Sequence, residues 1–505
     1  MSRCAVILQS LFRLDDRGFV TELYREILER DPDPGGLAHY TSLLAGGLSR
    51  HDLVARFLVS EEFIARSGLR DTLPVQGTFW TTAEWWQSVM GCSEHAGYME
   101  FPNEESVLVT QPQTIESREH PMFEIVRSCS RPMQQFVAFV PGGRVVGANG
   151  SVLTPDHKLL WDVSVEFVKP RVHTLHSKTE LPRATYIPET VAVLTSDVSQ
   201  NYYHWMFDVL IRVVLLRRSG MKIDRYVISR RKHLRFQDET LAAMGIPPDK
   251  VIDCTEGTHI RAKMLVVPSM AGYMGNPPKW LCRAFRQLMV EGRAPAAAGY
   301  DRIFISREDV NYRRVEHEDD LLDVLEGYGF RKVVLDRMSV LEQAALFSSA
   351  QVIVSPHGAG LANLVFCKPG TKLLELFAPE YVNACYWSLC EKAGIDYYYL
   401  VGNGAVPPEN TNSQANIDVD FLSVIRLLDR MGVEPAGRTI ADILQTAFQR
   451  DGFNYIKKLY RELLGREPDL PGLQDHLQAL STGKSKLATV ESFMRSEEAR
   501  ELYRY

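Results

Sequence analysis

A histidine and an aspartate stand four residues apart in the segment Asn201–Asp208. If this segment is helical, His204 and Asp208 project from the same face. The carboxylate would then hold the imidazole in one tautomer and raise its basicity, as expected of a general base and the group that orients it. An ordinary surface ion pair has the same spacing, but the bulky Trp205, Met206 and Phe207 in the same turn fit a cleft wall better. Asp208 as the base, with His204 binding the substrate, stays open.

A glycine-rich loop lies between a predicted strand, Gln351–Ser355, and a predicted helix, Leu361–Phe366. It reads Pro356-His357-Gly358-Ala359-Gly360-Leu361-Ala362-Asn363. This is a degenerate G-x-G-x-x-G pattern, in which Asn363 replaces the third glycine. Glycines in such a loop let the backbone approach a diphosphate, and the start of the next helix supplies N–H groups. A tight turn that binds nothing would have the same sequence, so the loop alone decides little.

Charged side chains stand near the ends of two further predicted strands. Arg307, Arg313 and Arg314 follow the first of these strands, and Glu375 stands near the end of the other. Because parallel strand ends face one crevice, the arginines could neutralise a diphosphate without a metal ion, and Glu375 could accept hydrogen bonds from ribose hydroxyls. Arg313 and Arg314 could instead balance the acidic run at 316–320. Glu375 lies among apolar residues, where an unpaired carboxylate is costly.

The elements that would position these groups alternate regularly after residue 301. A capping box, Ser339 with Glu342, opens one of the helices. Short apolar strands alternating with helices predict a parallel, doubly wound sheet. The predicted strands are Arg302–Ser306, Lys332–Leu335, Gln351–Ser355, Lys372–Leu376 and Asp396–Val401, and the predicted helices are Glu318–Tyr328, Val340–Ser349, Leu361–Phe366 and Cys385–Ala393.

The preceding part of the chain is less regular at first and then alternates in the same way. Its early section is rich in glycine, proline and β-branched residues, with candidate hairpins at Pro141-Gly142-Gly143 and Asn149-Gly150. A second α/β lobe is then predicted, with a turn-rich boundary at Gly272–Pro278. Its elements are strands Val191–Thr195, Tyr226–Ser229 and Met264–Pro268 and helices Tyr203–Arg218 and Gln237–Met244.

The two ends of the chain repeat each other without a gap. Leu23-Tyr24-Arg25-Glu26 recurs as Leu459-Tyr460-Arg461-Glu462, and Ser60-Glu61-Glu62 recurs as Ser496-Glu497-Glu498. Each copy predicts three helices, with Asp33 or Asp469 capping the second. We therefore divide the chain into a helical module (1–72), an α/β lobe (73–274), a Rossmann-like lobe (275–440) and a second helical module (441–505).

Bulk properties favour a globular protein of several domains, because 505 residues exceed one ordinary core. A net charge of −6 gives no general case for nucleic-acid binding. The eight cysteines are scattered, as expected of free thiols in a reducing compartment. No run approaches the roughly 20 apolar residues of a membrane span. We expect a cytoplasmic protein, with peripheral contact to the inner membrane or self-association through the helical modules left open.

The core motifs, in their order, resemble family 61 glycosyltransferases across about Thr190 to Gly402. The segment that contains His204 and Asp208 belongs to this resemblance, and the helical modules resemble a small bacterial domain family of unknown function, the 4214 family. The matching core segments are Asn201–Asp208, Ile305-Ser306-Arg307, Arg313-Arg314, Glu342-Gln343, Pro356–Leu361 and Glu375-Leu376-Phe377.

The resemblance implies a GT-B fold of two Rossmann-like lobes and an inverting, metal-independent sugar transfer. The donor would be a nucleotide sugar, with a UDP-sugar expected, and the acceptor a glycan or glycolipid of surface polysaccharide such as capsule or lipopolysaccharide. No other cofactor is expected. The residues expected at the nucleotide are Arg307, Arg313, His357, Gly358, Ala359, Gly360, Asn363 and Glu375, with Glu375 at the ribose.

Two other functions remain open at this point: a sugar-nucleotide epimerase of GT-B shape, and a non-catalytic scaffold of a polysaccharide assembly machine. We predict no metal site. The metal-binding D-x-D pattern of the other major transferase fold occurs only at Asp31-Pro32-Asp33, in a helical module, and at Asp418-Val419-Asp420, where a late helix is expected to start.

Overall fold

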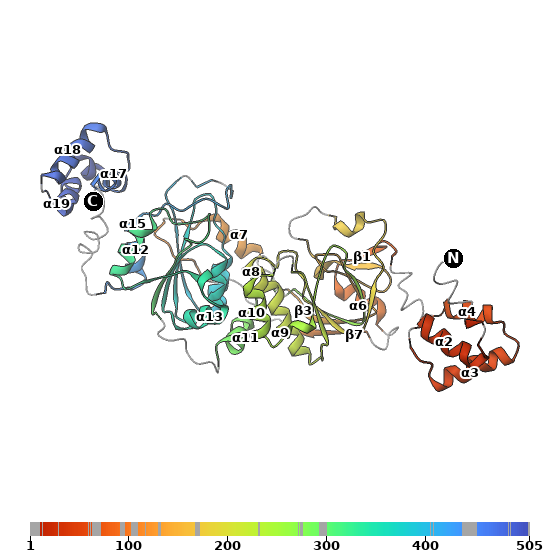
Figure 1. Cartoon of the computed structure of the whole chain (residues 1–505). Helices are drawn as coiled ribbons and strands as arrows, with labels where there is room; N and C mark the ends of the chain where they lie inside the picture. Colours follow the sequence, from red (N-terminus) through yellow and green to blue (C-terminus); the bar gives the residue numbers. More distant parts are fainter. Residues whose placement is uncertain are drawn as a thin grey trace.

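The computed structural model (Figure 1) contains two β-sheets with helices between them and a small helical module at each end. It describes residues 11–12, 14–28, 30–58, 60, 62, 72–90, 96–102, 110–116, 118–129, 133–166, 172–230, 233–270, 272, 276–291, 300–404, 406–407, 409–436, 452–482, 484 and 486–502. The mixed α/β architecture with helical termini is the one predicted.

The first sheet is mixed rather than purely parallel. Its path runs β1-β6-β5-β4-β10-β7-β8-β9, with β3 pairing β2 and β10. The stretch β10-β7-β8-β9 is parallel, and it contains the strands predicted for this half. The strand bounds are β1 Gly77–Phe79, β2 Gly97–Phe101, β3 Gln135–Pro141, β4 Arg144–Val146, β5 Ser151–Leu153, β6 Lys158–Leu160, β7 Thr185–Val193, β8 Arg225–Ile228, β9 Val251–Asp253 and β10 His259–Pro268.

One predicted hairpin of this sheet is confirmed and the other is wrong. Strands β4 and β5 are antiparallel neighbours joined through Asn149-Gly150, with Gly150 at a φ of 64°. At Pro141-Gly142-Gly143 the chain does not reverse, because β3 and β4 pair with successive parts of β10. Gly142, at a φ of 67°, makes a local irregularity in one continuing edge. The glycines of this segment allow the local backbone irregularity, and they do not form a hairpin turn.

The second sheet is parallel and has the order β12-β11-β13-β14-β15. Helices α13 (Val340–Ser349) and α14 (Cys385–Ala393) have their predicted bounds, and the capping box of Ser339 with Glu342 is present. The remaining elements agree with prediction to within about two residues. They are β11 Arg302–Ile305, β12 Arg331–Val333, β13 Val352–Pro356, β14 Lys372–Phe377, β15 Asp396–Val401 and α12 Glu318–Gly327. The late helix expected to start at Asp418-Val419-Asp420 is α15 (Phe421–Arg430), capped by Asp420.

Two predicted α-helices have another helical form. The segment expected as one helix, Tyr203–Arg218, consists of α8 (Tyr202–His204), a π-helix η3 (Trp205–Leu210) and α9 (Ile211–Ser219). The segment expected at Leu361–Phe366 is a 3-10 helix, η6 (Ala359–Phe366). Hydrophobic spacing indicates a helix but does not distinguish these forms. π-Helical turns often occur at functional sites.

The two halves share one buried core. Helices α9, α10 (Arg235–Ala243) and α11 (Trp280–Met289) lie between the two sheets in Figure 1. Buried side chains of η3, α9 and α11 belong to the same cluster as those of η6 and α14. Helix α7 (Pro121–Cys129), from the first half of the chain, packs on the second sheet through Phe123, which contacts Trp387 and Tyr399. The shared core fixes the groups of one half relative to the other.

Each helical module has its own small core. Asp33 and Asp469 cap their helices by accepting from the Gly36 and Gly472 amides, as predicted. The helices are α2 Asp16–Leu28, α3 Pro34–Ala45 and α4 Arg50–Leu58, and α17 Gly452–Leu464, α18 Leu470–Ser481, α19 Lys486–Met494 and α20 Glu497–Leu502. Among all described helices, none is both long and apolar enough to cross a membrane.

Candidate functional site

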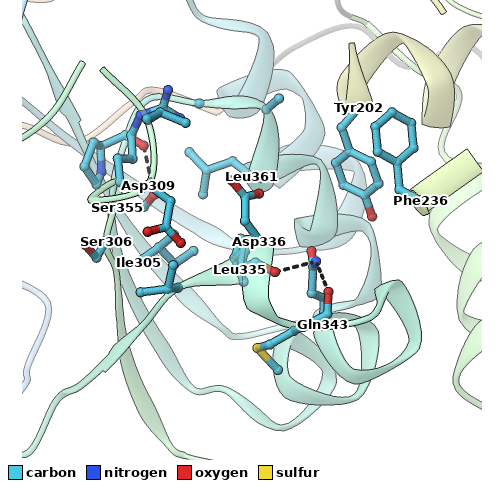
Figure 2. A pocket seen from close by; sticks show the side chains of 18 of the residues that line it. Tyr202, Phe236, Ile305, Ser306, Asp309, Leu335, Asp336, Gln343, Ser355 and Leu361 are labelled. Carbon is cyan, nitrogen blue, oxygen red and sulfur yellow. Dashed lines mark hydrogen bonds between the residues drawn. The ribbon is translucent and has the colours of Figure 1, made fainter. Parts of the chain in front are cut away.

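A cavity of about 410 Å³ lies between the two halves at the carboxyl ends of β11, β12 and β13 (Figure 2). Its other wall is formed by residues of α8 and α10, including Tyr202 and Phe236. Strand β11 lies between β12 and β13, so the order of connection reverses at this point of the sheet. Ligands of open α/β sheets bind at such switch points, and the volume suits a small-molecule ligand.

Two arginines predicted at the nucleotide line this cavity. Arg307 follows β11 directly, and its guanidinium group lies over the Tyr312 ring. Arg313 lies between the rings of Tyr312 and Tyr381. Burial lowers the pKa of Arg307, and the neighbouring Arg313 lowers it further. Two cations held close together at low solvent exposure favour an anionic ligand.

The glycine-rich loop reaches the cavity through Gly358, Ala359 and Gly360. A Cβ atom at Gly358 would stand 2.0 Å from Nη1 of Arg307, and one at Gly360 would stand 2.6 Å from Cδ1 of Leu335. Both glycines therefore make room for neighbouring side chains of this protein. Their part in the motif is explained by the placement of Arg307 and Leu335, which themselves face the cavity.

His357 and Glu375 form a buried pair beside the cavity and are not among its lining residues. The His357 Nδ1 atom lies 2.6 Å from Oε1 of Glu375, and the Tyr397 hydroxyl donates to Oε2 at 2.7 Å. Burial lowers the pKa of His357, Arg313 and Arg307 lower it further, and Glu375 opposes them. With both carboxylate oxygens engaged inside the protein, Glu375 supports His357 here, and the ribose position predicted for it is not one that the cavity reaches.

Asn363 likewise lies behind the cavity wall. It is fully buried, and its Oδ1 accepts a hydrogen bond at 2.8 Å from the Tyr202 hydroxyl of the other half. Its amide nitrogen donates to Oε1 of Gln343 at 2.7 Å, and the Gln343 amide donates to the Leu335 carbonyl at 2.9 Å. This chain of hydrogen bonds joins α8 to the loop after β12. Asn363 therefore ties the two walls of the cavity together.

His204 and Asp208 form the pair that their spacing predicts. His204 Nδ1 lies 2.8 Å from Oδ2 of Asp208, and the two side chains are 32% and 13% exposed. Arg212, one further turn along, is buried, and its Nη1 donates to the Thr195 carbonyl at 2.9 Å. Burial lowers the pKa of Arg212 to about 10, and the charge of Asp208 opposes this. A neutral His204 bonded through Nδ1–H has its lone pair on Nε2, as a base requires.

His204 is not in the cavity wall, although Asn201 and Tyr202 are. The structure thus brings Arg307, Arg313 and the loop Gly358–Gly360 together at one cavity. His204 and Asp208 follow the lining residue Tyr202 by two and six residues and lie outside the lining, and His357, Asn363 and Glu375 lie behind it.

The sequence did not single out several residues that line this cavity, among them Tyr202, Phe236 and Asp336. Asp336 lies three residues after the end of β12, in the short 3-10 helix Leu335–Arg337. The strand-end rule that selected Arg307 could therefore have found it. The aromatic residues come from the opposite wall, and no local pattern in the sequence indicates which residues face each other across a cleft.

Neither D-x-D pattern has the setting of a metal site. Asp420 caps α15, accepting from the Leu422 and Ser423 amides at 3.0 Å each. Asp31 is paired with Arg25, and Asp33 caps α3. Among the described residues, no group of three or more His, Cys, Asp or Glu side chains could hold a metal ion.

Residues 202–374 match the family model "Glycosyltransferase 61", and residues 9–67 and 446–503 match "Domain of unknown function (DUF4214)". The first match covers every residue predicted at the nucleotide except Glu375, which follows its last residue. The second covers both helical modules, in agreement with the repeat detected in the sequence.

Curated relatives match a smaller part of the chain. An EGF domain-specific O-linked N-acetylglucosamine transferase of Drosophila melanogaster is 28% identical over 180 residues, which are 32% of this chain and 34% of the relative. A protein of the same name from Xenopus laevis is 27% identical over 27% and 28% of the two chains. A beta-1,2-xylosyltransferase of Arabidopsis thaliana is 24% identical over 22% and 26%. The chain thus spans about a third or less of the length of these relatives.

Proposed function

We propose that the chain is a glycosyltransferase of the GT-B type that transfers a sugar, with inversion, from a nucleotide donor to a glycan or glycolipid acceptor. The observation that carries this proposal is the cavity itself. Two arginines and the glycine-rich loop line one wall, and the other wall begins the helix that holds the His204–Asp208 pair. The family model and the names of the relatives support the same reaction class.

In this reaction His204 removes the proton of the attacking hydroxyl through Nε2, while Asp208 holds Nδ1–H. The acceptor oxygen bonds to the anomeric carbon as the bond from that carbon to the diphosphate oxygen breaks. The arginines stabilise the negative charge of the leaving diphosphate, which is what preorganised cations do best. The positive charge of these arginines supports transfer without a resident metal ion. So do the two D-x-D patterns, in which aspartates cap helices or pair with an arginine.

We infer a UDP-sugar as donor, since the relatives are named as N-acetylglucosamine and xylose transferases. The acceptor is inferred to be a surface polysaccharide or its lipid-linked precursor on the cytoplasmic side of the membrane. The two helical modules, each with its own core, would then be the parts that dock on the membrane surface or a second copy.

The test is a donor screen with UDP-N-acetylglucosamine, UDP-xylose, and GDP- and CMP-sugars, read as nucleoside diphosphate or monophosphate released in EDTA. We expect release from one UDP-sugar, and a fall of roughly 100-fold in the Arg307→Ala variant, as for loss of one preorganised donor. Activity abolished by EDTA and restored by manganese would contradict the metal-free mechanism. Epimerised donor without transfer would identify an epimerase, and no turnover or binding of any donor would favour a scaffold.

A further inference from the structure

The cavity has different chemical character at its two ends. Arg307 and Arg313 form a cationic end at β11. Asp336 lies beyond the end of β12, and Figure 2 shows its carboxylate directed into the pocket, with Tyr202 and Phe236 on the facing wall. A ligand that fits this arrangement is anionic at one end, carries hydroxyl groups further along, and has a flat apolar part.

Three carboxylates line the cavity, and two of them have partners. Glu239 accepts hydrogen bonds from Arg235 at 2.5 Å and from the Val340 amide at 2.8 Å. Asp309 accepts one from Arg337 at 3.1 Å. Asp336 is exposed to the cavity, and within the described part of the chain no hydrogen bond or ion pair engages it. Its two oxygens are therefore available to accept hydrogen bonds from a ligand.

The register of the sheet brings the segment that carries Asp336 next to the one that carries Arg307. Ile305 of β11 pairs with Val333 of β12, so Arg307 and Asp336 follow two and three residues beyond paired positions on adjacent strands. Neighbouring strands are about 4.8 Å apart. A ligand whose diphosphate is bound by Arg307 would direct one of the two groups esterified to that diphosphate, the ribose or the donor sugar, toward the neighbouring loop, where Asp336 lies.

We propose that Asp336 binds the ribose of the nucleotide donor, accepting hydrogen bonds from its 2′- and 3′-hydroxyl groups. This assignment rests on the proposed function, and it replaces Glu375, whose oxygens are occupied by His357 and Tyr397. Asp336 is then a specificity-determining residue that selects ribonucleotides over deoxyribonucleotides. The base would lie toward Tyr202 and Phe236, whose rings offer a stacking surface.

The test compares ligand and residue changes together. Calorimetry measures the affinities of UDP, 2′-deoxy-UDP and CDP for the full chain and for three variants: Asp336→Ala, Asp336→Asn and Asp309→Asn. A hydrogen bond to a charged group gives roughly 10- to 100-fold in affinity. We expect the wild type to prefer UDP over 2′-deoxy-UDP by about this factor. In Asp336→Ala this preference should vanish, because UDP loses two hydrogen bonds while 2′-deoxy-UDP loses only the one from its 3′-hydroxyl group. Asp336→Asn should retain part of the preference.

Asp309→Asn is the matched control, since it neutralises a carboxylate of the same cavity that already has a partner, and it should keep the wild-type ratio. An unchanged ratio of UDP affinity to 2′-deoxy-UDP affinity in Asp336→Ala would overturn the assignment, and so would a wild type without this preference. If the wild type still binds UDP in either case, the proposed function stands. Loss of the preference for UDP over CDP instead would show that Asp336 recognises the base. A wild type that binds none of these nucleotides would refute the proposed function itself.

Discussion

Among the described residues, the His204–Asp208 and His357–Glu375 pairs have nearly equal hydrogen-bond geometry in very different surroundings. His204 Nδ1 lies 2.8 Å from Asp208, and His357 Nδ1 lies 2.6 Å from Glu375. In the first pair the histidine is 32% exposed, whereas in the second the side chains are 6% and 0% exposed. The hydrogen bond is the same, so the bond alone does not say which pair does chemistry.

What differs is access and the number of partners. Glu375 accepts from both His357 and Tyr397, and three aromatic rings, of Phe377, Tyr381 and Tyr386, surround His357. His204 ends α8 at the start of the π-helical turn that carries Asp208, and it is partly exposed, so a hydroxyl group can approach it. We therefore interpret the first pair as the base and its orienting group, and the second as a rigid support behind the glycine-rich loop.

The largest expected effect separates the two pairs by rate. His204→Ala should lower sugar transfer by about 10²- to 10⁴-fold, the usual cost of losing a general base. Its affinity for UDP should stay unchanged, because His204 does not line the cavity. His357→Ala should weaken UDP binding as well, since it loosens the loop that carries Gly358–Gly360. Turnover kinetics with calorimetric UDP affinities measure both.

The carboxylate of the first pair tests the roles within it. Asp208→Asn should give a milder defect than His204→Ala if Asp208 only orients the ring. If Asp208→Asn is inactive while His204→Gln keeps most activity, Asp208 is the base. Variants of both residues that lose UDP affinity in proportion to activity would show that the segment is structural and that the contrast between the two pairs is wrong.

The second expected effect concerns stability, for which the buried pair should matter more than the exposed pair. Glu375→Gln should lower the free energy of unfolding by about 1–3 kcal/mol, because His357 and Tyr397 both donate to the carboxylate and glutamine offers only one acceptor oxygen. Asp208→Asn should cost less, since water reaches His204. Urea denaturation of both variants measures the difference. Equal losses would mean that burial does not distinguish the pairs.

The two pairs also show which features of the fold and the site could be predicted from the sequence. The parallel sheet after residue 301, its capping box and the His204–Asp208 contact were all predictable, because each depends on neighbours in sequence or on alternation along the chain. That Glu375 lies outside the cavity lining could not be predicted, because the strand-end rule does not say which face a side chain takes. Leu374 and Leu376 enter one core, while Glu375 points with Leu373 and Phe377 toward the other.

The π-helical turn, the 3-10 form of η6 and the facing wall of the cavity depend on tertiary packing. Tyr202 and Asn363, whose side chains bond across the two halves, are 161 residues apart in sequence. No periodicity over a short window contains such a pair. The same holds for α7, which packs Phe123 against Trp387 of α14 and Tyr399 of β15 in the other half.

The smallest expected effect is a pH dependence of stability that belongs to the buried pair. Burial, with Arg313 and Arg307, lowers the pKa of His357 in the folded protein, whereas an unfolded histidine titrates near 6.5. Below about pH 6.5 the unfolded chain therefore binds more protons at this residue than the native one. The stabilisation is complete above the unfolded pKa and is lost as the pH falls, by at most about 1.4 kcal/mol per pH unit.

Burial also lowers the pKa of His120, His173 and His476, so the wild-type slope alone cannot be assigned to one residue. The measurement is the difference between wild type and His357→Gln in unfolding free energy, from urea titrations between pH 7.5 and 5.5. We expect the variant, whose amide can still donate to Glu375, to lose less stability on acidification. His204→Gln is the matched control, because that ring is already partly solvated in the native state. If His357→Gln and wild type have the same slope, the pKa of His357 is not lowered by folding. If the wild type instead gains stability relative to the variant on acidification, the buried imidazole carries its proton when folded, and Glu375 balances a charge instead of fixing a tautomer.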